Sequence, residues 1–350
     1  MKISNEKKLD FKINHRNWEE ALANAFALLI STNPGEVVCI VGPSRAGKTR
    51  LIHELCRLLF GVDVFNSNAH MPAVIVDAEN TGPNGTFSTK DFILRILEAI
   101  RHPLVSIGAE EGGVESIYQK FDRIAERTLR SILEKGLIFR GVRYLFIDEA
   151  QHVKYVSRDA VGAYAVMDSW KCLAKSANIV LVVVGAYPVL EILEKSPHLL
   201  GRKHQVHLPR YLLTESDLLE FSCIVKSYEL HVIISPKLGS LNNCIEILYE
   251  YSLGCIGLLR GWLMRASAMA SVAGGGITKE ILMEMRLSDS DLASISKEIL
   301  LGEQSLLKNP HGSSDKKTRP TPPPDKSKSG KPFQRNPRRM EEGNRLRNKK

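Results

Sequence analysis

Residues 42–49 of the chain read Gly42-Pro43-Ser44-Arg45-Ala46-Gly47-Lys48-Thr49. This stretch fits the pattern G-x-x-x-x-G-K-[S/T] in full. A continuous apolar run, 37–41, precedes it, and a helical pattern extends from Thr49 to Phe60. A glycine-rich turn between a buried strand and a helix start presents backbone N–H groups that bind phosphate oxygens. The sequence therefore predicts a phosphate-binding loop at 42–49.

The residue types in this loop predict its ligand. Lys48 is expected to reach the β- and γ-phosphates of ATP, and the Thr49 hydroxyl is expected to bind Mg²⁺. The other nucleotide-binding residues predicted here are Gly42, Pro43, Ser44, Arg45, Ala46, Gly47 and the following Arg50.

A second motif, which is acidic, lies about 100 residues after the phosphate-binding loop. There the apolar run 144–147 ends in Asp148 and Glu149. Carboxylates at the carboxyl end of a strand lie where parallel α/β sheets bind ligands. Asp148 is expected to help hold Mg²⁺, and Glu149 to polarise the attacking water. A solvated acidic pair is the alternative interpretation, but the preceding phosphate loop favours a catalytic one.

Apolar runs of strand length recur at 37–41, 73–76, 144–147 and 179–184, and amphipathic helical stretches separate them. Strands that alternate with helices indicate a parallel sheet with helices on both faces. After Pro209 the pattern becomes helical, with no strong strand. We therefore expect an N-terminal extension at 1–14, an α/β nucleotide-binding domain at 15–209, a helical lid domain at 210–300 and a disordered tail at 301–350.

The net charge of +9 comes from the end of the chain. Residues 308–350 hold 14 Lys and Arg against 4 Asp and Glu, a net charge of +10, so residues 1–307 are close to neutral at −1. The same segment is rich in proline and poor in large apolar residues, which predicts disorder. Its basicity favours a flexible arm for nucleic acid or for an acidic partner, and a solubilising tail is the alternative.

Six scattered cysteines without a CxxC pair are typical of buried thiols in a reducing cytosol. The polar N-terminus lacks the apolar stretch of a signal peptide, and no apolar run is long enough for a membrane span. We therefore expect a cytoplasmic protein that has no membrane partner.

Taken together, several motifs within 15–290 resemble the AAA+ ATPase regulators of transposition, the TnsC/TniB class of Tn7-like and CRISPR-associated elements. The motifs that carry this resemblance are the loop 42–49, Ile147-Asp148-Glu149-Ala150-Gln151-His152, the strand ending at Gly185, Leu199-Leu200-Gly201-Arg202, Val206-His207-Leu208-Pro209-Arg210-Tyr211 and Cys255-Ile256-Gly257-Leu258-Leu259-Arg260. The first two are common to AAA+ proteins, whereas the Leu-Pro-Arg-aromatic segment and the glycine-rich entry to the last long helices are closer to this class.

The resemblance implies a ring or helical filament of this chain on duplex DNA in the ATP state. It would link a TniQ-like target selector to transposase subunits. Arg202 would act in trans on a neighbour's γ-phosphate, and Arg260 would be a second sensor of the nucleotide. Thr89 and Lys90 would contact DNA, although 88–91 also fits a helix N-cap. At position 186 the class usually has a polar residue that contacts the attacking water, whereas this chain has Ala186. Because of this departure, we expect slow hydrolysis.

Three other functions fit parts of the sequence. A DEAx-type helicase needs a second RecA-like domain, and 210–300 shows no strands to build one. A scaffold that binds ATP without turning it over is favoured by Ala186. An AAA+ helicase loader or secretion ATPase shares the core, and genomic neighbours would distinguish it from a transposition regulator.

Overall fold

The computed structural model describes residues 13–65, 69–82, 85–105, 124–156, 160–194 and 203–308. The first half of the described chain contains α1 (Arg16–Ser31), β1 (Val37–Val41), α2 (Lys48–Phe60), β2 (Ala73–Asp77), α3 (Thr89–Ala99), α5 (Glu126–Phe139), β3 (Tyr144–Asp148) and the 3₁₀ helix η2 (Ala150–Tyr155). The second half contains α6 (Ala160–Ser176), β4 (Val180–Gly185), α7 (Pro188–Glu194), β5 (Lys203–His207), α8 (Glu215–Glu229), η4 (Leu241–Cys244), α9 (Ile245–Ser252), α10 (Ile256–Val272), α11 (Lys279–Glu284) and α12 (Asp289–Lys308).

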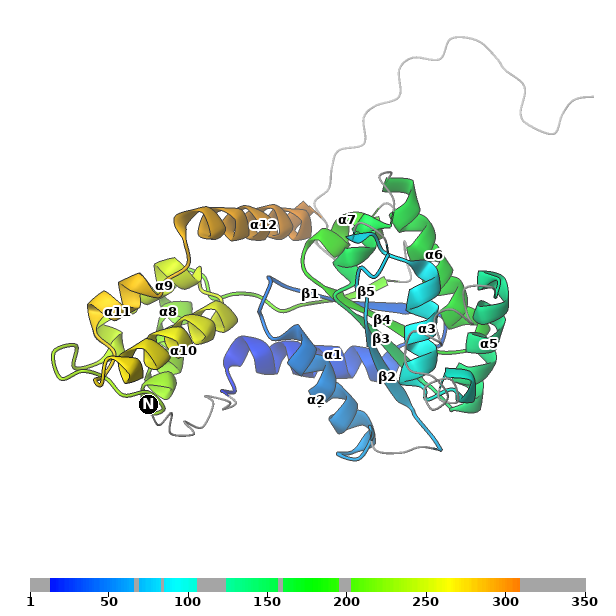
Figure 1. Ribbon diagram of the computed structural model, residues 1–350, viewed down its shortest axis with the longest axis horizontal. Helices are drawn as coiled ribbons and strands as arrows, with labels where there is room; N and C mark the ends of the chain where they lie inside the picture. Colours follow the sequence, from blue (N-terminus) through cyan, green and yellow to red (C-terminus); the bar gives the residue numbers. More distant parts are fainter. Residues whose placement is uncertain are drawn as a thin grey trace, which may run out of the picture. The chain divides into compact units, whose positions relative to one another are not determined.

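Five strands form one parallel sheet in the order β2-β3-β4-β1-β5 (Figure 1). β4 lies between β1 and β3, with Val41 opposite Gly185 and Ile147 opposite Val183. The strand that precedes the phosphate loop and the strand that ends in Asp148 are therefore both neighbours of β4. This order brings the two sequence motifs to the same carboxyl edge of the sheet.

Alternate side chains of the strands pack into two separate apolar layers. Val38 and Ile40 of β1 face α1 and α2, whereas Val37, Cys39 and Val41 face the layer of α3, α5, α6 and α7. A parallel sheet covered on both faces needs strands that are apolar at nearly every position. The expected α/β class with a sandwiched parallel sheet is therefore confirmed.

Strand β5 was not expected from the sequence. It pairs only with β1 and thus lies at the edge of the sheet. Its sequence Lys203-His204-Gln205-Val206-His207 has one apolar residue, because an edge strand buries fewer side chains than a central one. One of the amphipathic helical stretches between the apolar runs, at 116–135, overlaps α5, and its residues 116–123 lie outside the described ranges.

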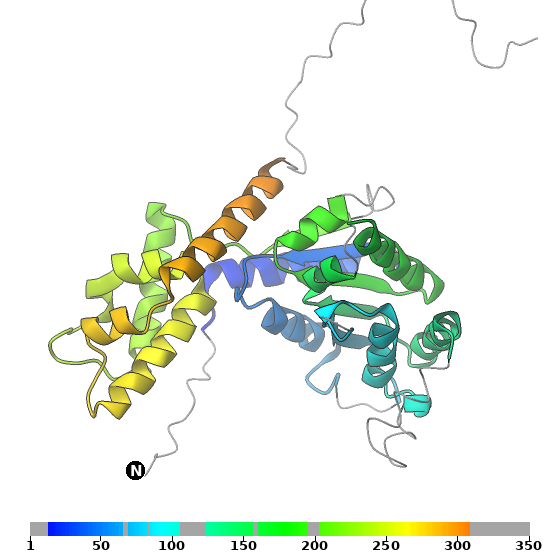
Figure 2. The same ribbon diagram turned by 45° about the horizontal axis from the view of Figure 1, so that its top comes forward.

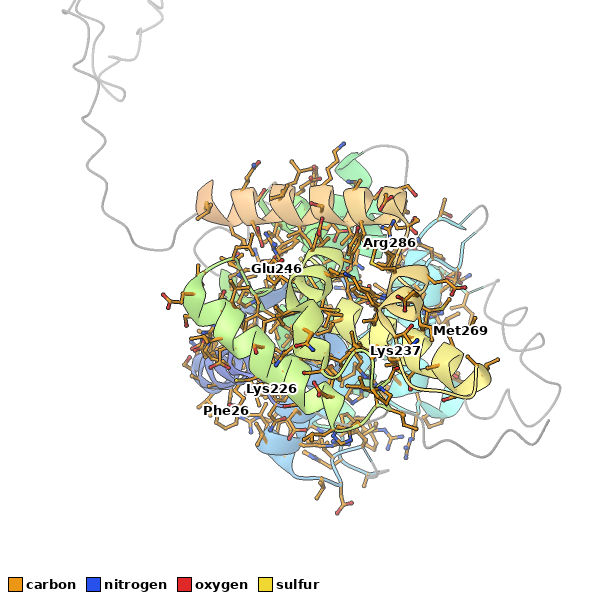
Figure 3. All side chains as sticks on the ribbon, turned by 90° about the vertical axis from the view of Figure 1, so that its left-hand side faces the viewer. Phe26, Lys226, Lys237, Glu246, Met269 and Arg286 are labelled. Atoms are coloured by element: carbon orange, nitrogen blue, oxygen red, sulfur yellow. The ribbon has the colours of Figure 1, made fainter. Side chains whose placement is uncertain are left out.

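Helices α8 to α11 gather in one region of the molecule (Figures 1 and 2). Their apolar side chains form a third core that contains Phe221, Leu248 and Trp262. Figure 3 shows the side chains of this helical region, including Lys226 on α8 and Met269 on α10. Among the described residues of this region, the one β-type pairing is a single parallel bridge between Ile234 and Ile277. The expected helical region after the sheet is present.

Helix α12 returns from the helical region to the α/β core. Arg210 donates two hydrogen bonds to the carboxylate of Glu303, at 2.8 and 3.1 Å. A Cβ on Gly302 would lie 2.0 Å from Cγ of Tyr187, so only glycine allows this close packing. The helix continues to Lys308, and residues 310–350 separate from the compact unit of 1–309. The expected start of the tail at 301 therefore falls inside a helix and is corrected.

Among the described helices, none combines the length and the apolar character that crossing a membrane requires.

Candidate functional site

The phosphate loop lies between β1 and α2. Gly47 has φ +94°, a left-handed conformation that suits glycine, and it is the N-cap residue of α2. No side chain caps the N-terminus of α2. Because the first N–H groups of a helix have no partners within it, this helix start can bind an anion.

Lys48 is buried in the loop, and its ammonium donates to the carbonyl oxygens of Pro43 at 2.8 Å and Gly42 at 3.2 Å. Burial lowers the pKa of Lys48, whereas the nearby carboxylates of Glu149 and Asp148 oppose this shift. The ammonium thus lies at the loop and can exchange its carbonyl partners for phosphate oxygens.

Thr49 and Asp148 meet across the carboxyl edge of the sheet. The Thr49 hydroxyl donates to Oδ2 of Asp148 at 2.6 Å, and Oδ1 accepts from the backbone N–H of Glu149 at 2.8 Å. Asp148 is 1% exposed, and burial raises its pKa while the Thr49 bond opposes that rise. A hydroxyl and a carboxylate are hard oxygen ligands of the kind Mg²⁺ prefers, so this pair fits the predicted metal.

Glu149 directly follows β3 and has φ +52°, an uncommon conformation for a non-glycine residue. This backbone turn separates its side chain from that of Asp148, which remains bonded to Thr49. Its carboxylate accepts a hydrogen bond from the side-chain amide of Gln151 on η2.

A hollow of about 470 Å³ adjoins the loop. Its walls come from three regions of the chain: the segment before and at the start of α1, the loop with α2, and helices α8 and α10. Residues of the three regions that line it are Ile13, His15, Trp18, Arg45, Arg50, Tyr228, Gly257 and Arg260. The guanidinium of Arg50 lies 5.3 Å from the ring centre of Trp18. The hollow is next to the phosphate loop, and its size and mixed lining suit a nucleoside.

His15 is neutral in this hollow. Its Nδ1 lies 3.0 Å from the hydroxyl of Tyr211, and burial, with the charge of Arg50 second, lowers its pKa to about 4. An uncharged imidazole is compatible with an uncharged nucleobase in the same hollow.

The structure places the other predicted residues as follows. Arg45 is exposed in the loop, and Arg260 on α10 lines the hollow together with it. Thr89 and Lys90 are half-buried at the start of α3, a helix that packs beside the edge strand β2. The Ser88 side chain accepts from the Asp91 N–H at 3.2 Å, so the N-cap interpretation of 88–91 is confirmed. Arg202 lies outside the described residues.

The hollow and the α12 contacts were not predicted from the sequence. Of the wall residues, Gly257 stands in the quoted motif 255–260, whereas Ile13 and Tyr228 stand in no quoted motif and lie more than 200 residues apart along the chain. Helix α12 brings Glu298 to the loop, where it accepts from the Ser44 hydroxyl at 3.3 Å. The periodic apolar residues of α12 were the only available signal for that contact.

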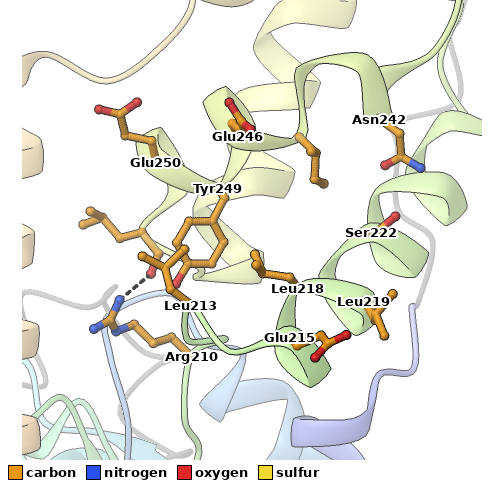
Figure 4. Close-up of a pocket in the computed structure, with 12 residues that line it drawn as sticks. Arg210, Leu213, Glu215, Leu218, Leu219, Ser222, Asn242, Glu246, Tyr249 and Glu250 are labelled. Atoms are coloured by element: carbon orange, nitrogen blue, oxygen red, sulfur yellow. Dashed lines mark hydrogen bonds between the residues drawn. The ribbon is translucent and has the colours of Figure 1, made fainter.

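A second hollow of about 800 Å³ lies in the helical region (Figure 4). Leu213, Leu219 and Tyr249 form an apolar wall, and Glu246 stands among the residues around it. Arg210 also lines this hollow and donates to the Leu253 carbonyl at 3.2 Å. It contains no residue of the phosphate loop, so it is a separate feature from the nucleotide site.

A phosphate loop after β1, an acidic pair after β3, and a helical region that reaches the loop define a P-loop protein of the AAA+ fold. Residues 32–193 match a protein-family model described as AAA domain. This match agrees with the AAA+ P-loop fold that the sheet and the phosphate loop define.

Solved structures similar to this chain include the Walker-type ATPase of Pyrococcus abyssi, with 16% identity, a TM-score of 0.49, and coverage of 83% of this chain and 75% of that one. The ORC2 protein of Aeropyrum pernix in its ADP form has 17% identity and a TM-score of 0.49, over 79% and 70% of the two chains. Cdc6p of Pyrobaculum aerophilum has 15% identity and a TM-score of 0.47, over 86% and 73%. No curated protein sequence matches the chain. The domain assignment rests on the match over 32–193 and on the site.

Proposed function

We propose that this chain is a Mg²⁺-dependent ATPase that uses nucleotide binding and hydrolysis as a switch. The observation that carries the proposal is the meeting of Lys48, Thr49, Asp148 and Glu149 at one edge of the sheet, with Thr49 bonded to Asp148. These four residue types are those that ATP hydrolysis in a P-loop site requires.

Each residue has a distinct task. Lys48 binds the β- and γ-phosphates, and the loop N–H groups hold the remaining oxygens. Thr49 and Asp148 hold Mg²⁺, which neutralises phosphate charge when bound. Glu149 orients and deprotonates the attacking water as general base.

The nucleoside is proposed to enter the hollow beside the loop. Because Tyr228, Gly257 and Arg260 come from the helical region, nucleotide binding would connect that region to the α/β core. Arg260 lines the same hollow as the loop residue Arg45, which supports its role as a sensor of the nucleotide state.

The wider role we propose is that of a regulator of transposition that assembles on duplex DNA. Support comes from the motifs shared with the TnsC/TniB class and from the net charge of +10 on residues 308–350. In this role Arg202 acts in trans between copies, and Thr89 and Lys90 contact the DNA backbone. The assembly would link a TniQ-like selector to transposase subunits.

A scaffold that binds ATP without hydrolysis is the second candidate. Ala186, directly after β4, is 4% exposed and brings no polar side chain to the site. Measurement of turnover separates this candidate from the first.

Two variants test the site. Lys48→Ala should weaken ATP binding by about ten- to a hundredfold, the usual range for a lost charged hydrogen bond. Glu149→Gln should bind ATP as the wild type does and lose turnover. Equal ATP affinity in Lys48→Ala and wild type would contradict the assignment.

Electron microscopy of the full chain with duplex DNA tests the wider role. Rings or filaments should form with ATP and not with ADP or without nucleotide. Assembly that is independent of nucleotide would contradict the proposed switch.

A further inference from the structure

Gln151 connects the proposed general base to the end of the central strand. Its side-chain nitrogen donates to Oε2 of Glu149, and its side-chain oxygen accepts from the backbone N–H of Ala186 at 3.1 Å. One side chain on η2 therefore joins the residue after β3 to the residue after β4.

The two bonds fix the orientation of the amide. A carboxylate accepts hydrogen bonds, and a backbone N–H donates one, so each end of the amide has a partner of only one kind. A flipped amide would place oxygen against oxygen and nitrogen against nitrogen. The donor end of Gln151 therefore points to Glu149.

Gly185 leaves the space that this arrangement needs. A Cβ at position 185 would lie 2.5 Å from the side-chain oxygen of Gln151 and 2.6 Å from Cγ2 of Val189. Any larger residue at 185 would displace the amide, so glycine at the end of β4 and Gln151 fit each other.

The strand end that the amide contacts lies beside the strand that leads into the phosphate loop. β4 is the neighbour of β1, and Gly185 pairs with Val41, the residue directly before Gly42. Ala186, the next residue, carries only a methyl group and is 4% exposed. Gln151 brings a side-chain amide to this end of β4 from a different element.

We propose that Gln151 is the positioning residue for Glu149, and that its amide replaces the polar side chain that position 186 lacks. This proposal rests on the proposed ATPase function. Gln151 holds the carboxylate in one orientation toward the phosphate loop, so that its second oxygen can accept the proton of the attacking water. Nucleotide binding does not involve Gln151, because Lys48 and Thr49 hold the phosphates.

Two substitutions at Gln151 separate positioning from packing. Gln151→Glu retains an oxygen that accepts from Ala186 but replaces the donor to Glu149 with a like charge. Gln151→Ala loses both bonds. We expect kcat to fall about ten- to a hundredfold in both variants, the range for a lost charged hydrogen bond, with the Kd for ATP within about twofold of wild type. The matched controls are Gln304→Glu and Gln304→Ala, at an exposed position on α12.

A rescue variant keeps the test independent of folding. Adding Ala186→Asn to Gln151→Ala returns an amide to the end of β4, and kcat should recover at least in part. ATP affinity and melting temperature are measured on every full-length variant, so that turnover is compared only between folded proteins that bind ATP.

The outcomes are distinct. A wild-type kcat in Gln151→Glu would overturn this proposal alone, since the bond to Ala186 would then suffice. Absence of recovery in the folded, ATP-binding double variant would overturn the replacement of position 186. Wild-type protein that binds ATP without turnover would overturn both this proposal and the hydrolytic part of the proposed function.

Discussion

Gly257, in the first turn of α10, lies directly against the backbone carbonyl of Arg45 in the phosphate loop. A Cβ at position 257 would be 1.8 Å from that oxygen and 2.8 Å from its carbonyl carbon. The obstacle is backbone and not the end of a flexible side chain, so a larger residue cannot be accommodated without moving the loop or the helix. The helical region thus approaches the backbone of the phosphate loop closely at this glycine.

Gly257→Ala should therefore weaken both stability and ATP binding. Overpacking of this kind costs about 1–3 kcal/mol. Thermal unfolding and ATP titration measure the two effects. Gly275→Ala is the matched control, because a Cβ there meets nothing within 4 Å. Equal ATP affinity in the two variants would contradict a role for this contact in the nucleotide site.

The depressed pKa of His15 predicts a pH-dependent stability. In the unfolded chain the imidazole takes up a proton near pH 6.5, whereas in the folded protein it does so only near pH 4. Between these values the unfolded state binds more protons, so the unfolding free energy should fall as the pH falls. The slope contributed by His15 approaches about 1.4 kcal/mol per pH unit.

Chemical denaturation from pH 7.5 to pH 4 measures this slope for the wild type and for His15→Gln. The variant should show a shallower slope between pH 6.5 and pH 4. Identical slopes in the two proteins would show that His15 is protonated equally in both states.

Arg202 is expected to complete a neighbour's site. Arg202→Ala should bind ATP normally as an isolated subunit and hydrolyse it poorly when assembled. Mixing Arg202→Ala with Glu149→Gln should restore part of the turnover, because some interfaces then combine an intact Glu149 with an intact Arg202. A well-mixed assembly with no recovery would count against action in trans.

The basic segment should supply an attraction to DNA that is independent of sequence. Deleting 309–350 leaves α12 complete and should weaken DNA binding at low salt. The logarithm of the DNA association constant falls linearly with the logarithm of the salt concentration. Each lost phosphate contact should make this slope shallower by about 0.9. ATP-dependent assembly should persist, since its proposed contacts lie near Thr89 and Lys90. An unchanged salt slope would reassign the segment to partner binding or solubility.

The sequence predicted the four strands that are apolar along most of their length, because strands covered by helices on both faces carry a strong signal. Edge strand β5 and the short helix α7 carried weaker patterns and were missed. Loop residues such as Lys48 were also predictable, since their spacing reflects phosphate geometry. The partnership of Thr49 with Asp148 was implied by their shared metal role, and the structure brings them together.

Residues that act through tertiary contacts were harder to predict. Gln151 stood in a quoted motif, but its two partners depend on how η2 lies against β4. Gly257 also stood in a quoted motif, but its close approach to the Arg45 carbonyl is visible only in the structure. Such contacts arise from packing between segments that are distant in the sequence, so the local periodicity of apolar residues does not predict them.

Helix α12 gives the molecule an uneven local stability. Leu292 and Ile299 are its buried large apolar side chains among the described residues, and most of its other side chains are exposed or half-buried. The strands β1 and β4, in contrast, are buried along their whole length. An element with few buried apolar contacts opens locally at a lower free energy than a buried central strand. The amide hydrogens of α12 should therefore exchange with solvent ahead of those in β1 and β4.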